Sequence, residues 1–201
     1  MAEPRGMAPP PHRYRGGVTR RIPLILFLAG GLAIAGCGSS SSSSGGTTTT
    51  ATAANGGHPA GALPSESSKM VCASEAQIDI AASIGVKATV TKPTWINHVY
   101  SCKYTYPSGV ITLSVNELDN AAQTTKAYTA FAASLGRRPD VVSFGQGAFI
   151  TTNGSVIVRK DFKVLDVDVS QLPLKFGVPP QDRSNVALSV AATVMSCWTG
   201  A

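Results

Sequence analysis

The side chains of this sequence that are best able to do chemistry are its four cysteines, Cys37, Cys72, Cys102 and Cys197. A thiol can be acylated, can form a disulfide or can act as a nucleophile once it is ionised. No two of these cysteines have the Cys-x-x-Cys spacing, which argues against dithiol redox catalysis. The sequence therefore favours anchoring or structural bridging, and the neighbours of each cysteine distinguish between the two.

Cys37 follows a segment that is typical of an exported protein. An arginine-rich stretch ends at Arg21, and an apolar run from Ile22 to Gly36 leads directly to the cysteine. This run is shorter than the ~20 residues that a membrane-spanning helix needs. We therefore expect residues 1–36 to be a signal peptide that takes no part in the fold.

The end of this segment, Ile34-Ala35-Gly36-Cys37, resembles the lipobox of bacterial lipoproteins, an aliphatic residue and two small residues before a cysteine. The resemblance implies that Cys37 receives a diacylglycerol and palmitate-type acyl chains and becomes the first residue of the mature protein. Two acyl chains anchor a protein stably. We expect a lipid-anchored protein on the extracytoplasmic face of the cell membrane. The alternative is an ordinary secretory signal followed by a chance cysteine.

The basic charge of the chain is concentrated in its N-terminal segment. The net charge of the whole sequence is +6, and five of its 17 basic residues lie within the first 21 positions. Only about +2 remains from Cys37 onward. A nucleic-acid-binding domain needs a basic face of its own, so we expect no nucleic-acid partner.

Residues 37–69 are predicted to form a flexible linker that begins at the lipidated cysteine. The stretch contains six consecutive serines and four consecutive threonines, and its first charged residue is Glu66. Such a composition buries too little apolar surface to offset the entropy of ordering the chain. We expect one domain over residues 70–201, a common size for a single domain.

The hydrophobic periodicity of this domain predicts three helices, at 74–84, 119–135 and 183–198. Ser74 with Gln77 three residues later predicts a capping box. Period-two alternation predicts a hairpin of strands over 99–106 and 111–116, joined by a Pro-Ser-Gly turn at 107–109. Further strands are expected at 141–152, 155–159 and 162–169, the first two joined by an Asn-Gly turn.

This order, α-β-β-α-β-β-β-α, places hairpin-linked strands between helices. Strands joined by short hairpins pair in the antiparallel sense. The expected fold is therefore α+β, a mainly antiparallel sheet covered by helices.

Several motifs of the domain together resemble a known group of proteins. They are a cysteine before the first helix (Cys72), the Cys-x-Tyr of the first strand (102–104), a glycine-rich strand entry (142–149) and a later strand at 155–159. In layout they are similar to small actinobacterial cell-envelope lipoproteins with a domain of unknown function, and to the extracellular sensor domains of mycobacterial receptor kinases. The resemblance implies an envelope location and carries over no activity.

If Cys37 is lipidated, three cysteines remain for bridging in an oxidising compartment. We favour a Cys72–Cys102 disulfide, which would link the start of the first helix to the first strand and leave Cys197 as a buried thiol. A disulfide across a loop of this length contributes roughly 3–4 kcal/mol in the chain-entropy model. The alternative pairs Cys197 with one of the other two.

The sequence contains no recognisable catalytic set, so we expect no enzymatic activity and no cofactor. Nucleophile elbows, phosphate loops and zinc-protease motifs are absent from it. His98, the single histidine of the domain, is interpreted as a structural residue rather than a catalytic one. Asp161, Asp166 and Asp168 are interpreted as solvated carboxylates rather than as a calcium site, so no metal is expected.

Two classes of function remain. The first is a non-catalytic accessory protein that binds an envelope protein. The alternative is a module that binds a lipid, glycan or other small apolar ligand, supported by the low charge and by the aromatic residues Trp95, Tyr100, Tyr104, Tyr106, Phe144, Phe149 and Trp198. A concave apolar pocket of a few hundred Å³ would favour the ligand module. An exposed apolar patch would favour a protein partner.

Overall fold

The computed structural model describes residues 57–198. They form an α+β domain with a mainly antiparallel sheet, as predicted. The segment predicted to be a signal peptide, Cys37 and the first part of the predicted linker lie outside the described residues. The helical segments are α1 Glu66–Lys69, the 3-10 turn η1 Met70–Cys72, α2 Ser74–Ile84, α3 Ala121–Leu135 and α4 Arg183–Cys197.

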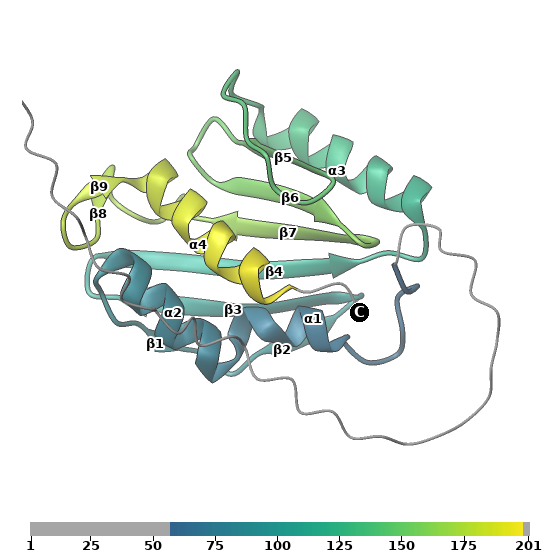
Figure 1. Ribbon diagram of the computed structural model, residues 1–201, viewed down its shortest axis with the longest axis horizontal. Helices are drawn as coiled ribbons and strands as arrows, with labels where there is room; N and C mark the ends of the chain where they lie inside the picture. Colours follow the sequence, from purple (N-terminus) through teal and green to yellow (C-terminus); the bar gives the residue numbers. More distant parts are fainter. Residues whose placement is uncertain (1–56, 199–201) are drawn as a thin grey trace, which may run out of the picture. The chain divides into compact units, whose positions relative to one another are not determined.

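Seven strands form the main sheet, in the spatial order β1-β3-β4-β7-β6-β5, with β2 also paired to β3. All the pairs are antiparallel (Figure 1). The strands are β1 Thr89–Val90, β2 Thr94–Ile96, β3 Val99–Tyr106, β4 Gly109–Glu117, β5 Gly147–Ile150, β6 Val156–Lys160 and β7 Lys163–Asp168. A separate two-stranded sheet pairs β8 Lys175–Phe176 with β9 Gln181–Asp182.

Helices cover both faces of the main sheet. Successive strand residues point to opposite faces, so Leu165 joins the core under α2 and α4, whereas Val164 joins the core under α3. Both side chains are at most 1% exposed, and full burial of such a side chain stabilises the fold by about 1.5–3 kcal/mol. In Figure 1, α2 and α4 cross the sheet side by side, and their packing forms the larger core.

The predicted α3 stripe contacts the sheet as expected. Tyr128, Phe131, Ala132 and Leu135 pack against the buried Phe149, Ile157 and Val164. The buried side chains of α4 are those of Val186, Ala187, Val190, Ala191 and Val194.

The predicted capping box at the start of α2 is wrong. Ala73 is the N-cap residue and Ser74 is already helical. Gln77 does not reach back to the cap amide, because its side-chain nitrogen donates a hydrogen bond of 2.9 Å to the carbonyl of Cys72. The helix start is instead fixed by η1, which precedes it directly and carries Cys72.

The folded region begins before the expected boundary at residue 70. Ser65 caps α1, and its backbone amide donates a 2.8 Å hydrogen bond to the Glu117 carboxylate. Ser68 also donates to this carboxylate, and Ala60 donates its amide to the carbonyl of Leu118. Glu117 is only 4% exposed. Part of the segment expected to be linker is therefore attached to the end of β4.

Candidate functional site

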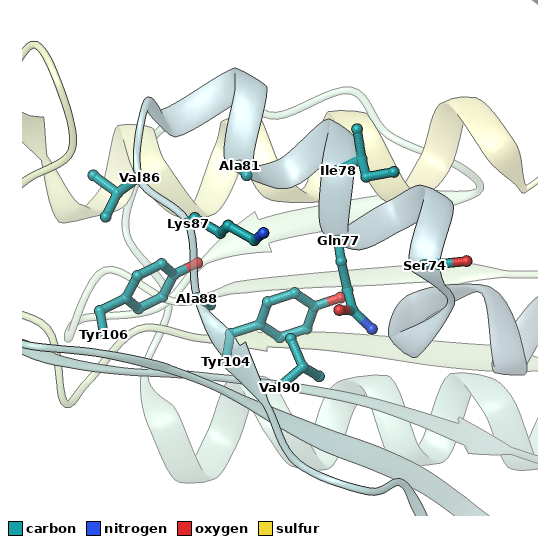
Figure 2. Close-up of a pocket in the computed structure, with 10 residues that line it drawn as sticks. All are labelled: Ser74, Gln77, Ile78, Ala81, Val86, Lys87, Ala88, Val90, Tyr104 and Tyr106. Atoms are coloured by element: carbon teal, nitrogen blue, oxygen red, sulfur yellow. The ribbon is translucent and has the colours of Figure 1, made fainter.

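A pocket of about 360 Å³ lies between α2, the segment that follows it and β3. Figure 2 shows its lining, in which the helix and the two tyrosines of β3 face each other. Apart from one lysine, the lining side chains are apolar or uncharged. They are Ser74, Gln77, Ile78 and Ala81 from α2, Val86, Lys87, Ala88 and Val90 from the segment after it, and Tyr104 and Tyr106 from β3.

The turn η1, just before α2, is held to β3 by a disulfide and a hydrogen bond. The first is the disulfide Cys72–Cys102, whose Cα atoms are 6.1 Å apart. The second is a 2.7 Å hydrogen bond that the Tyr104 hydroxyl donates to the carbonyl of Val71. The favoured disulfide pairing is thus the one in the structure, and it links the segment before α2 to the strand that carries Tyr104 and Tyr106.

The C-terminal end of α2 is held at Gly85. This glycine has a φ of +70°, and a Cβ on it would lie 2.1 Å from the carbonyl oxygen of Val178. Only glycine combines this left-handed conformation with so close an approach of another backbone. The Val178 amide also donates a 2.8 Å hydrogen bond to the carbonyl of Ile84. Both ends of the helical wall are therefore fixed, which is the preorganisation that a binding site requires.

Two tyrosine hydroxyls face this pocket in different states. Tyr104 is 1% exposed and Tyr106 is 4% exposed. The Tyr104 hydroxyl is satisfied by Val71, whereas that of Tyr106 has no hydrogen-bond partner among the described residues. Burial raises the pKa of Tyr106 to about 12, so the group remains a neutral O–H donor at ordinary pH. Its ring is held edge-on to Phe176, with the centroids 4.9 Å apart.

Lys87 is the single charged residue among the lining side chains. It is exposed, and none of the ion pairs found among the described residues includes it. In the view of Figure 2 its side chain extends along the pocket, below α2 and above the tyrosine rings. The pocket thus combines apolar walls, one unpartnered hydroxyl donor and one ammonium group.

A second cavity, of about 380 Å³, is comparable in size but differs in chemistry. Its two cationic side chains are already engaged, since Arg138 pairs with Asp140 at 2.9 Å and Arg183 donates to the carbonyls of Ser170 and Leu172. The contacts of Arg183 give its guanidinium group a structural role at the start of α4, and Arg138 pairs within the loop that follows α3. The α2–β3 pocket is therefore the better candidate for binding.

Only some of the aromatic residues proposed for ligand binding lie at the pocket. Tyr104 and Tyr106 line the pocket, whereas Phe149 and Trp198 are buried in the two cores. Trp95 lies on β2, where its indole nitrogen donates a 3.0 Å hydrogen bond to the carbonyl of Ala62. Tyr100 and Phe144 pack at the margin of the larger core. Sequence reasoning missed Gln77, Lys87 and the other lining residues around them.

The remaining candidate residues lie apart from the pocket. His98 is exposed in the turn between β2 and β3, where its ring stacks on Trp95 at 5.8 Å. Cys197, expected to be buried, is instead half-buried as the last residue of α4, and its sulfur lies 3.9 Å from the Ser196 hydroxyl. Over residues 57–198 no group of histidine, cysteine, aspartate and glutamate side chains could hold a metal ion. In the same part of the chain no helix is long and apolar enough to cross a membrane.

The interpretation of Asp166 as a solvated carboxylate is wrong. Its Oδ1 atom is buried on the face of β7 opposite to the pocket and has no hydrogen-bond partner among the described residues. Burial raises the pKa of Asp166 to about 7, and the charge of Asp168 on the same strand face adds to the increase. Asp168 differs, because it accepts hydrogen bonds from the Ser155 hydroxyl and the Ser170 amide.

Comparison with known proteins gives no match: no family model, no curated protein and no solved structure is similar to this chain.

Proposed function

We propose that this chain is a lipid-anchored extracytoplasmic protein whose domain binds a small, mainly apolar ligand in the α2–β3 pocket. The observation that carries the proposal is the pocket itself. It measures about 360 Å³ and is walled by Ile78, Ala81, Val86 and Val90. Ligand pockets are commonly 300–1,000 Å³, mostly apolar, with a few polar groups that orient the ligand.

The chemistry of the lining supports binding rather than catalysis. The hydroxyl of Tyr106 stays protonated because burial raises its pKa to about 12. No histidine or carboxylate is among the lining residues to act as its base. A protonated hydroxyl without a base can orient a ligand, but it is not an activated nucleophile.

A ligand module fits this fold better than an accessory protein with an apolar docking face. The exposed large apolar side chains within residues 57–198 come from α2, from β2 and from loops rather than from one helix or sheet face, and they are Leu63, Ile78, Ile96, Val141, Leu174 and Val178. Scattered single apolar residues are normal on a protein surface. Of these, Ile78 lies at the pocket, where it would contact the entering ligand.

Ligand binding in the α2–β3 pocket is tested by a substitution that fills the pocket with a larger side chain. Ala81 lines the pocket from α2, whereas its neighbour Ala82 is exposed on the same helix. We expect saturable fluorescence enhancement of the neutral apolar probe N-phenyl-1-naphthylamine with the unmodified protein and with Ala82→Phe, but not with Ala81→Phe. Equal binding by all three proteins, or no saturable binding at all, would overturn the proposal.

The anchor is a separate part of the proposal, and it depends on Cys37. We expect the chain expressed in its native host to fractionate with membranes and to carry diacylglycerol and acyl mass on Cys37. Cys37→Ser should move the protein to the aqueous fraction, since the mature chain would lose its acyl groups. Membrane retention of this variant would show that lipidation of Cys37 is not the anchor.

A further inference from the structure

The polar end of the α2–β3 pocket specifies its ligand more closely than its apolar walls do. Resting on the ligand-binding function proposed above, we infer that the ligand is an amphiphile with a carboxylate head group, such as a medium-chain fatty acid. The hydroxyl of Tyr106 donates a hydrogen bond to the carboxylate, and the ammonium group of Lys87 neutralises its charge. The alkyl chain lies along the apolar surface of α2.

The hydroxyl of Tyr106 lacks a hydrogen-bond partner among the described residues, which is the first observation in favour of a carboxylate ligand. A tyrosine that is 4% exposed normally has a partner for its hydroxyl. The neighbouring Tyr104 obeys this rule through Val71, and Tyr106 does not. The two residues are two positions apart on the same face of β3, so strand geometry does not explain the difference. A donor left over inside a pocket lining is satisfied when a ligand supplies an acceptor oxygen.

The positive charge of the pocket lining is the second observation in favour of a carboxylate ligand. Lys87 is the single charged group among the ten residues of Figure 2, and no lining carboxylate offsets it. A neutral apolar ligand would leave this ammonium group without a role, whereas a carboxylate pairs with it. A hydroxyl donor and an ammonium group on one anion form charge-assisted hydrogen bonds, which are stronger than neutral ones.

Tyr106 and Lys87 differ in how exposed their polar atoms are to solvent. The Tyr106 hydroxyl is shielded from solvent, whereas the Lys87 side chain is exposed at the pocket. A lysine side chain changes rotamer within picoseconds to nanoseconds. Lys87 is therefore free to move its ammonium group toward a carboxylate that enters the pocket.

The test compares decanoate with 1-decanol, which have equal chain lengths but differ in charge, by displacement of the neutral probe from the full-length chain. We expect the unmodified protein to bind decanoate about tenfold more tightly than decanol, a preference typical of a charge-assisted hydrogen bond. Lys87→Met should remove most of this preference. Tyr106→Phe should weaken decanoate binding by about tenfold.

Two matched variants serve as controls. Lys126→Met removes an exposed lysine on α3, and Tyr100→Phe removes a hydroxyl on β3 outside the lining. Both should bind decanoate like the unmodified protein.

The outcomes separate this inference from the proposed function. Equal affinity for decanol and decanoate in the unmodified protein, or unchanged decanoate binding in Lys87→Met and Tyr106→Phe, would overturn the carboxylate assignment while the pocket stands. Failure of the protein to bind the probe or either ligand would overturn the ligand-binding function as well. A circular-dichroism melt of each variant shows whether it is folded. If Tyr106→Phe does not fold, Lys87→Met, which changes an exposed residue, still decides the test.

Discussion

Replacing Tyr106 by phenylalanine should make the ligand-free protein more stable. The substitution keeps the ring and its 4.9 Å edge contact with Phe176, and it removes only a buried hydroxyl that has no partner among the described residues. An unsatisfied buried donor costs about 1–3 kcal/mol. Taking the lower end, because solvent reaches the rest of the pocket, we expect a gain of about 1 kcal/mol. For a domain of this size the melting temperature should rise by about 3–5 °C.

The matched control is Tyr104→Phe, two residues earlier on the same strand. Its hydroxyl donates to the Val71 carbonyl at 2.7 Å, so its removal leaves a buried carbonyl unpaired. This variant should lose about 1–2 kcal/mol. Urea denaturation of both variants without ligand measures the two signs directly. Destabilisation of Tyr106→Phe by 1 kcal/mol or more, to the same extent as Tyr104→Phe, would refute the reasoning, because it would show that the Tyr106 hydroxyl is already satisfied.

Three further substitutions test the surroundings of the site. Burial raises the pKa of Asp166 to about 7, so the folded state holds a proton more tightly than the unfolded chain does. The free energy of unfolding therefore falls as the pH rises from about 4 to 7. Asp166→Asn should flatten this part of the pH profile and be more stable than the parent protein at pH 8. Glu117→Ala should cost about 2–4 kcal/mol in urea denaturation, because it removes a buried acceptor of hydrogen bonds from Ser65 and Ser68; a cost below 0.5 kcal/mol would contradict this role. Gly85→Ala should cost roughly 2 kcal/mol or more, since its Cβ would lie 2.1 Å from the Val178 carbonyl oxygen; a thermal melt unchanged from the parent would be inconsistent with that contact.

The sequence predicted the long elements well because their patterns are local. The alternation over 99–106 and 111–116 corresponds to β3 and to most of β4, and the helical periods correspond to α2, α3 and α4. The strand predicted over 141–152 is wrong in length, because only Gly147–Ile150 forms β5. The sequence analysis missed β1, β2, β8 and β9, which have two or three residues each. Strands of this length have no measurable periodicity and form only because a neighbouring strand offers partners.

The candidate site was predicted only in part for the same reason. Tyr104 and Tyr106 alternate with polar residues, so their shared inward face was readable from the sequence. Lys87 belongs to the irregular segment after Gly85, and its place beside β3 depends on the pairing of Thr89 with Thr105. The burial of Asp166 was unreadable as well, because α3 covers that face of the sheet from a distant part of the sequence.

Native mass spectrometry of the full chain, purified from its own membrane, tests the central claim most directly. We expect a small amphiphile that is held without a covalent bond by the unmodified protein and by Ala82→Phe, is released on denaturation, and is absent from Ala81→Phe. Because Ala81 lines the pocket and Ala82 is exposed on the same helix, only the first substitution fills the binding space. Recovery of the same ligand from Ala81→Phe, or of no ligand from any of the three proteins, would show that the α2–β3 pocket does not bind a ligand.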